Sequence, residues 1–162
     1  MPHIFTLAGE LKTGTRVLDV GCGNGYTAGQ FLERGCTVVG IDLSESGIGI
    51  ARKAFPKGRF DVLPADENIL LNLDEKPFDL VVSTEVVEHL YAPRPYVQGC
   101  FAALRPGGRF ICTTPYHGYL KKLGDCTRQP LGSPCKSPVG RRSYQTVEPK
   151  NTHLAFGRGR FR

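Results

Sequence analysis

The stretch RVLDVGCGNG, residues 16–25, decides the fold of this chain. Its first half is a short apolar run, and its second half places glycines at Gly21, Gly23 and Gly25. A helical pattern follows over residues 26–34, and Gly35 is placed to end that helix. A buried strand, a glycine turn and a helix predict the start of a βαβ unit. Because ligands of open parallel sheets bind beyond the carboxyl ends of the strands, we expect this turn to line a ligand site and the new helix to offer unpaired amides.

Four further apolar runs repeat the strand-like pattern, and helical or polar segments separate them. We expect strands at residues 16–20, 37–41, 59–63, 78–83 and 109–114. We expect helices at residues 4–11, 26–34, 46–54 and 93–104, and a helical segment over residues 86–90. Residues 105–108, RPGG, are typical of a sharp turn. This alternation predicts a parallel sheet with helices on both faces, a Rossmann-like doubly wound α/β fold.

The composition is that of one globular domain without a membrane segment. A length of 162 residues suits one core, and no run approaches the roughly 18 apolar residues of a membrane span. The N-terminus lacks a basic start followed by an apolar stretch, so we expect no signal peptide and a cytoplasmic protein. None of the six cysteines forms a C-x-x-C pair, which indicates buried thiols rather than a zinc ribbon or a disulfide framework.

The basic charge belongs to the C-terminal part of the chain. Residues 1–120 hold 11 Lys and Arg against 13 Asp and Glu, whereas residues 121–162 hold 10 against 2. Residues 121–162 also show no convincing period of two or 3.6, so we expect a basic, Pro- and Gly-punctuated disordered tail after a folded domain of residues 1–120. A nucleic-acid partner for the folded part is therefore not expected.

The spacing of the glycines narrows the ligand. The dinucleotide fingerprint G-x-G-x-x-G has its third glycine where Tyr26 stands here. Walker A is excluded because no Gly-Lys-Ser/Thr follows the turn. The pattern present is Asp-x-Gly-x-Gly-x-Gly, beginning at Asp19.

Five motifs carry a resemblance to a known family: VLDVGCGNG, VGIDLS, PADEN, FDLVVSTEVVEHL and LRPGGRFICTTP. In this order and spacing, over residues 11–119, the chain resembles the class I S-adenosylmethionine-dependent methyltransferases, and especially the branch with ubiquinone-biosynthesis O-methyltransferases. The resemblance implies five parallel strands in the order 3-2-1-4-5. The family's last strands, which include an antiparallel hairpin, find no counterpart after Tyr119. We therefore expect a truncated domain with an aberrant or out-of-frame extension.

The resemblance also implies the cofactor site. Asp19 would orient the methionine end of S-adenosylmethionine, and Asp42 would accept hydrogen bonds from both ribose hydroxyls. Asp66 would accept from the adenine amino group, and Thr84 and Glu85 would lie beside the sulfonium and the methyl acceptor. The remaining expected cofactor contacts are Gly21, Cys22, Gly23, Leu43, Ala65 and Glu67. The alternative for each of the three Asp residues is a structural role, in which the carboxylate bonds nearby loop amides or caps the N-terminus of a helix.

A second constellation follows the fourth strand. Glu85, Glu88 and His89 have the helical spacing i, i+3, i+4 and would share one face of a helix. This ExxEH pattern resembles a divalent-metal motif of small-RNA 2′-O-methyltransferases. The alternative is that acids in a first helical turn are stabilised by the helix dipole without any ligand. His89 and His117 are candidate acceptor-side general bases.

Three functions follow from these motifs. The first is methyl transfer from S-adenosylmethionine to a hydroxyl of a small molecule, in which positioning does much of the work. The second is an inactive cofactor-binding fragment or interaction module. The third is an RNA methyltransferase that uses the basic tail as an electrostatic arm.

Overall fold

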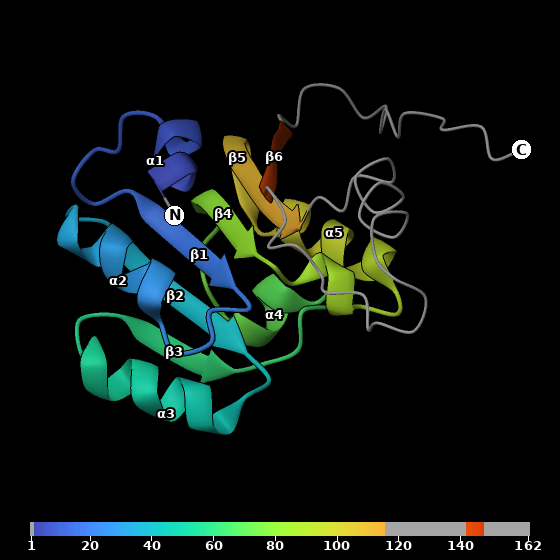
Figure 1. The fold of residues 1–162 in the computed structure, drawn as a ribbon, viewed down its shortest axis with the longest axis horizontal. Helices are drawn as coiled ribbons and strands as arrows, with labels where there is room; N and C mark the ends of the chain where they lie inside the picture. Colours follow the sequence, from blue (N-terminus) through green and yellow to red (C-terminus); the bar gives the residue numbers. More distant parts are fainter. Residues whose placement is uncertain (1, 116–141, 148–162) are drawn as a thin grey trace, which may run out of the picture.

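The protein is built on one mixed β-sheet. A computed structural model describes residues 2–115 and 142–147. In these residues six strands lie in the order β3-β2-β1-β4-β5-β6 (Figure 1). The strands are β1 (Arg16–Val20), β2 (Thr37–Asp42), β3 (Arg59–Val62), β4 (Phe78–Thr84), β5 (Leu104–Pro115) and β6 (Arg142–Val147). The first five pair in parallel, which confirms the predicted strands and their order 3-2-1-4-5.

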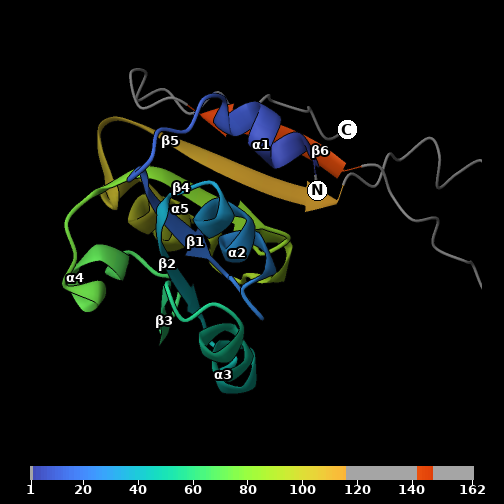
Figure 2. The ribbon, with the colours of Figure 1, turned by 90° about the vertical axis from the view of Figure 1, so that its left-hand side faces the viewer.

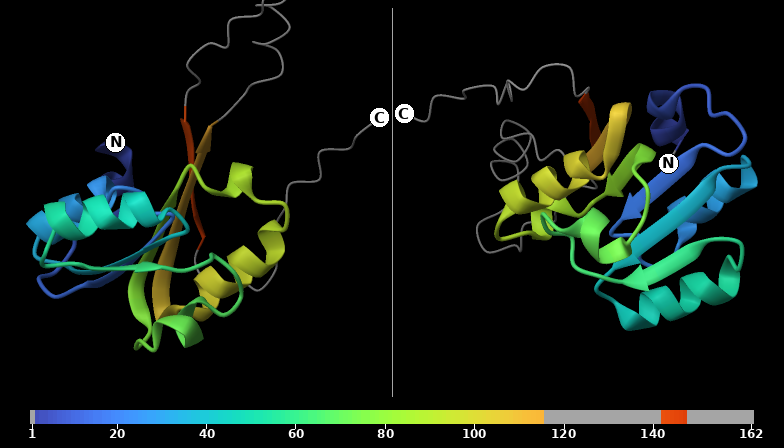
Figure 3. Two further views of the ribbon diagram at one scale, coloured as in Figure 1. Left: turned by 90° about the horizontal axis from the view of Figure 1, so that it is seen from below. Right: turned by 180° about the vertical axis from the view of Figure 1, so that it is seen from behind.

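Helices cover both faces of the sheet, as Figures 2 and 3 show. One face carries α1 (Pro2–Ala8), α2 (Tyr26–Glu33) and α3 (Glu45–Ala54). The other carries α4 (Ile69–Leu73), the 3-10 turn η1 (Val87–His89) and α5 (Pro93–Ala102). The sequence did not predict α4, because five residues between polar segments are too few to show a helical period. No helix among the described residues has both the length and the apolar character needed to cross a bilayer.

The core forms two layers because strand side chains alternate between the faces. Val17 joins the layer under α1, α2 and α3, and Leu18 joins the layer under α4 and α5. Phe31 and Phe60 fill the first layer, and the Phe5 and Phe31 rings lie 4.9 Å apart where α1 meets α2. Tyr96 and Phe78 fill the second layer, so both halves of the sheet are closed over aromatic residues.

The helix α3 contains two glycines that weaken its intrinsic propensity, and tertiary packing explains one of them. The Ser44 hydroxyl accepts a hydrogen bond from the Gly47 amide at 3.1 Å and caps the helix. A Cβ on Gly47 would lie 3.0 Å from the carbonyl oxygen of Gly23, whereas Gly49 has open space. Gly47 therefore lets α3 approach the glycine turn after β1.

The last two strands differ from the prediction. The expected turn at residues 105–108 is a bulge inside β5, between the pairs Phe78–Leu104 and Leu80–Arg109. Beyond it, β5 pairs antiparallel with β6 in the register Phe110–Val147. The sequence predicted no strand in the tail, because β6 lacks a clear period of two. Apart from residues 142–147, the predicted tail lies outside the described residues.

The thiols behave as the sequence predicted where they are described. Cys22, Cys36 and Cys100 are buried and free, and Cys112 is half-buried and free. Burial raises the pKa of the Cys22 and Cys100 thiols, so both stay protonated and unreactive near neutral pH. The other two cysteines, Cys126 and Cys135, lie outside the described residues.

Candidate functional site

The carboxyl ends of β1, β2 and β4 meet at one edge of the sheet. The parallel register pairs Asp19 with Gly40 on β2 and with Val82 on β4, so the segments that follow these strands emerge together. Asp19, Asp42, Thr84 and Glu85 are thereby brought to one place from positions up to 66 residues apart in the sequence. This edge, with the glycine turn at its centre, is the candidate site.

The three glycines of the turn have different physical roles. All have left-handed backbones, with φ of 75° at Gly21, 53° at Gly23 and 81° at Gly25. A Cβ on Gly21 would lie 2.2 Å from Val86 Cγ2, and one on Gly25 would lie 2.9 Å from Ala51 Cβ. A Cβ on Gly23 would meet nothing within 4 Å. Packing therefore explains Gly21 and Gly25, while Gly23 exposes backbone to open space where a ligand can approach.

Four amides of the turn have hydrogen-bond partners within the protein. The Gly21 and Cys22 amides both donate to the Ile41 carbonyl, at 2.8 and 3.0 Å. The Gly23 amide donates to Asp42 Oδ2, and the Gly25 amide donates to the Cys22 carbonyl. These four bonded amides leave the turn without the row of free donors that a P-loop offers to phosphate oxygens. The expectation of unpaired amides concerns the helix that follows, which begins at Tyr26, and stays a prediction.

Asp42 stands at the end of β2 with both carboxylate oxygens held. Oδ2 accepts from the Gly23 amide and Oδ1 from the Ser44 amide, each at 2.8 Å. Each oxygen keeps acceptor capacity for a further donor. The next side chain, Leu43, is 70% exposed, and Val62 at the end of the neighbouring strand is 40% exposed. A fixed acceptor therefore lies beside an apolar surface, which suits a sugar with an attached aromatic base.

Asp19 is the most unusual group of the site. Its side chain is fully buried, and neither carboxylate oxygen has a hydrogen-bond partner among the described residues. Burial raises the pKa of Asp19 to about 7; the nearby Ala28 amide acts in the opposite direction, and the Asp42 charge adds to the rise. A buried carboxyl without a partner is costly in a folded protein, so this one is suited to receive a donor or a cation from a ligand.

Glu85 does not lie on a helix, which corrects the predicted ExxEH face. Its φ is 59°, and the 3-10 turn η1 begins only at Val87. Glu88 and His89 are exposed on that turn. The three side chains do not form a metal-binding group, and no such group of His, Cys, Asp and Glu exists in the described part of the chain. The prediction fails because the left-handed backbone of Glu85 interrupts the 3.6-residue period on which the shared helical face depended.

The loop after β3 carries the other predicted contacts. Asp66 Oδ1 accepts from the Asn68 amide at 2.8 Å, just before α4. Ala65 and Asp66 are half-buried and Glu67 is exposed. A Cβ on Gly99 of α5 would lie 1.8 Å from the Asp66 carbonyl oxygen, so α5 packs directly on this loop. His117, the second predicted base, lies outside the described residues.

Charges are distributed unevenly over the molecule. Every ion pair found among the described residues uses Asp61, Glu75 or Asp79. The carboxylates at the candidate site take part in none of them: Asp19, Asp42, Asp66, Glu67, Glu85 and Glu88. The site is therefore acidic without compensating cations from the described residues, which favours a ligand that carries positive charge.

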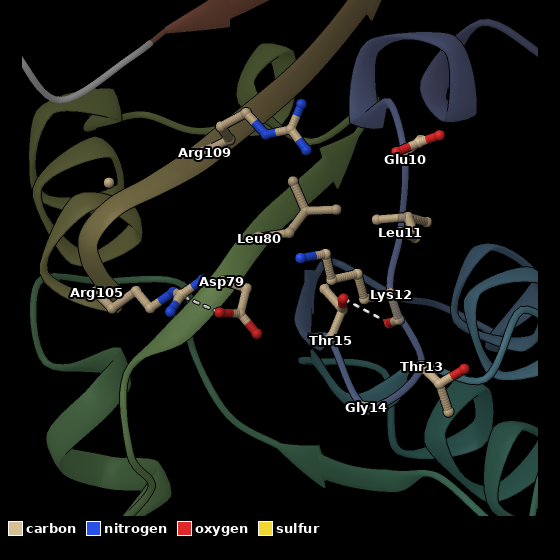
Figure 4. Close-up of a pocket in the computed structure, with 11 residues that line it drawn as sticks. Glu10, Leu11, Lys12, Thr13, Gly14, Thr15, Asp79, Leu80, Arg105 and Arg109 are labelled. Atoms are coloured by element: carbon tan, nitrogen blue, oxygen red, sulfur yellow. Dashed lines mark hydrogen bonds and ion pairs between the residues drawn. The ribbon is translucent and has the colours of Figure 1, made fainter.

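A separate hollow of about 400 Å³ lies at the opposite edge, by the amino ends of β1 and β4 (Figure 4). Three of its charged side chains have structural partners: Arg105 pairs with Asp79, and Arg109 donates to the Leu7 and Ala8 carbonyls at the end of α1. Asp79 also accepts from the Arg16 amide at 2.7 Å. These contacts tie α1 and β5 to the sheet, which is a structural role.

Two residues of the site were missed by sequence reasoning. Thr113 on β5 is 1% exposed and contacts Glu85, and Ser83 on β4 donates to the Val20 carbonyl at 2.8 Å. Both are hydroxyl residues inside otherwise apolar strands, at or near the carboxyl end. That position was the available signal, because a buried hydroxyl there needs a partner from a neighbouring strand or loop.

Fold and site together define an α/β protein whose candidate site holds carboxylates without cationic partners in the part of the chain that the structure describes. The sequence model of one family, described as "Methyltransferase domain", matches residues 18–112. The chain belongs to this family of S-adenosylmethionine-dependent methyltransferases, which confirms the predicted resemblance.

Curated relatives and solved structures agree with this assignment. The ubiquinone biosynthesis O-methyltransferase of Maricaulis maris is 36% identical over 113 residues, which are 68% of this chain and 44% of that protein. The enzyme of the same name from Idiomarina loihiensis is 38% identical over 62% of this chain and 42% of its own length. A TehB-like SAM-dependent methyltransferase from Corynebacterium glutamicum superimposes with a TM-score of 0.59 at 29% identity, over 66% of this chain and 58% of its own. The chain thus spans less than half the length of the curated relatives it matches.

Proposed function

We propose that this chain binds S-adenosylmethionine at the carboxyl edge of β1, β2 and β4 and presents its methyl group to a hydroxyl of a small molecule. The observation that carries the proposal is the buried, unpartnered carboxyl of Asp19 in a site whose other acids also lack cationic partners. S-adenosylmethionine supplies two positive groups, an ammonium and a sulfonium, and the sulfonium makes the methyl group electrophilic.

The residues present fit this cofactor group by group. Asp42 accepts hydrogen bonds from the ribose hydroxyls, with its carboxylate held by the Gly23 and Ser44 amides. Asp19 receives the ammonium of the methionine end, beside Gly21, Cys22 and the open backbone of Gly23. The bonded amides of Gly21, Cys22, Gly23 and Gly25 are not available as donors to a pyrophosphate at the turn.

The adenine and the reacting centre lie on either side of the ribose. Leu43 covers the adenine, Asp66 accepts from its amino group, and Ala65 and Glu67 flank its edge. Thr84 and Glu85 face the sulfonium and the acceptor. His89 stays a candidate acceptor-side base from its exposed turn, and His117 is the other candidate.

The preference for a small-molecule acceptor rests on the O-methyltransferase relatives and on the balanced charge of residues 1–120. Since the chain spans only part of those relatives, acceptor binding is tested separately from cofactor binding. Titration calorimetry with S-adenosylmethionine on the full chain should show one site. Asp42→Asn should weaken that site by at least about tenfold, as loss of a charged hydrogen-bond acceptor does.

A matched control is Glu33→Gln, which removes an exposed acid at the end of α2 and should leave the affinity unchanged. Folded protein that binds no S-adenosylmethionine would refute the proposal. Methyl release from labelled cofactor is then measured against phenols, catechols, small acids and RNA. Binding without release on any acceptor would identify a cofactor-binding module, and release on RNA alone would replace the small-molecule acceptor.

A further inference from the structure

Glu85 is held in a backbone conformation that side chains other than glycine seldom adopt. Its φ of 59° lies in the left-handed region, at the point where the chain leaves β4. Such conformations persist only where surrounding contacts enforce them, and they concentrate at functional positions. The contacts that enforce this one come from β5.

Thr113 contacts Glu85 through both its main chain and its side chain. The Thr113 carbonyl accepts from the Glu85 amide at 2.9 Å, and the Thr113 hydroxyl donates to Glu85 Oε1 at 3.2 Å. Thr113 is 1% exposed and lies opposite Thr84 in the register of β4 and β5. Because a buried hydroxyl has little room to turn away, this pair of contacts fixes where the carboxylate lies.

The segment that carries Glu85 touches the glycine turn. Val86, the next residue, lies so close to Gly21 that a Cβ on the glycine would be 2.2 Å from Val86 Cγ2. Thr113 also falls on the same face of the sheet as Asp19, since Ile111 and Val17 belong to one core layer and each lies two residues away along its strand. The Glu85 carboxylate therefore lies at the site edge with no cation beside it in the described residues.

We propose that Thr113 is a positioning residue: its hydroxyl holds the Glu85 carboxylate where it raises the affinity for the positively charged sulfonium cofactor relative to that for its neutral thioether product. This inference rests on the proposed function and deepens it. S-adenosylmethionine and S-adenosylhomocysteine differ by one methyl group and one positive charge. A fixed carboxylate discriminates between them by charge.

The test measures the dissociation constants of both ligands by titration calorimetry on the full chain at low salt. Thr113→Val keeps the shape and the main-chain bond but removes the hydroxyl, and Thr113→Ser keeps the hydroxyl. The measured quantity is the affinity for S-adenosylmethionine divided by that for S-adenosylhomocysteine. We expect Thr113→Val to lower this affinity ratio by about fivefold, the scale of a partly exposed charge pair. Thr113→Ser should keep the ratio of the wild type. Glu85→Gln should match Thr113→Val.

The control is Thr15→Val, whose lost hydroxyl bonds the Lys12 carbonyl at the far edge and should not alter the ratio. Equal ratios in the wild type, Thr113→Val and Glu85→Gln would overturn the inference while leaving cofactor binding intact. Absence of binding of either ligand to the folded wild type would instead refute the proposed function. If Thr113→Val does not fold, the comparison of Glu85→Gln with Thr113→Ser tests the inference. Glu85→Gln should then have the lower affinity ratio, and equal ratios in these two variants would overturn the inference.

Discussion

The buried carboxyl of Asp19 makes the stability of the protein depend on pH in an uncommon direction. Burial raises the pKa of Asp19 from 3.8 to about 7, so the folded chain holds this proton more tightly than the unfolded chain does. The stabilising contribution is fully present below pH 3.8 and is lost as the pH rises through 7, where an ionised carboxylate is buried. The ordinary Asp, with a lowered pKa, behaves in the opposite way.

The size of the effect follows from the shift. At 1.36 kcal/mol per pKa unit, the ionised group costs the folded state about 4 kcal/mol above pH 8. Between pH 5 and pH 8 the loss is about 2.5 kcal/mol, because part of it has already occurred below pH 5. Asp19→Asn keeps the shape of the side chain and removes this proton equilibrium.

The assay is urea unfolding of the wild type and Asp19→Asn at intervals from pH 5 to pH 8. The free energy of unfolding of the variant minus that of the wild type should rise by about 2.5 kcal/mol over this range. Other titrating groups are common to both proteins and cancel. A difference that stays flat with pH would refute the reasoning. With S-adenosylmethionine in excess the rise should shrink, because the ligand ammonium stabilises the carboxylate.

Three further predictions concern packing and backbone. Gly29→Ala places a Cβ 2.2 Å from the Phe55 ring and should destabilise the protein by about 1–3 kcal/mol. Its counterpart Gly49→Ala, on α3 with open space around it, should stabilise the protein by up to about 1 kcal/mol. The midpoint of urea unfolding measures both changes. Asp74→Gly should stabilise by about 0.5–1 kcal/mol in a thermal melt, because Asp74 ends α4 with φ of 49°. Phe31→Ala should cost about 3–5 kcal/mol in urea, since its ring is fully buried, and a loss below 1 kcal/mol would contradict the two-layer core.

Much of the fold could be predicted because each of the first five strands is a local signal. The apolar runs around Val17, Val38 and Val81 are short, β-rich and bounded by turn residues, and the helices between them have recognisable starts and stops. The order of the strands followed from the resemblance and from the handedness of βαβ units. The bulge at residues 105–108 is a different case: Pro106 and Gly107 mark a break in the chain, but only pairing with β4 shows that β5 continues through it.

The identity of the acids in the site was readable from the sequence, since each lies at or shortly after the carboxyl end of a strand. The sequence predicted that Asp19 and Asp42 belong to the site, but it did not predict their burial or their hydrogen bonds. That Asp19 is buried without a partner depends on the packing around it, and the Gly23 amide that holds Asp42 is 19 residues away in the chain. The helical face expected for Glu88 and His89 was wrong because the residue before Val86 adopts a left-handed backbone.

The sequence by itself determined the strand–turn–helix unit of residues 16–34 and the acids near the carboxyl ends of the strands, because these depend on residues close together in the chain. The order of the parallel strands is not local, and it followed from the resemblance to a known family. The tertiary structure alone decided which turn amides are already bonded, which carboxylates lack partners, and that Thr113 holds Glu85. Hydrogen bonding and desolvation depend on what surrounds a group in space. Residues that surround this site come from β1, β2, β4 and β5, which only the folded sheet brings together.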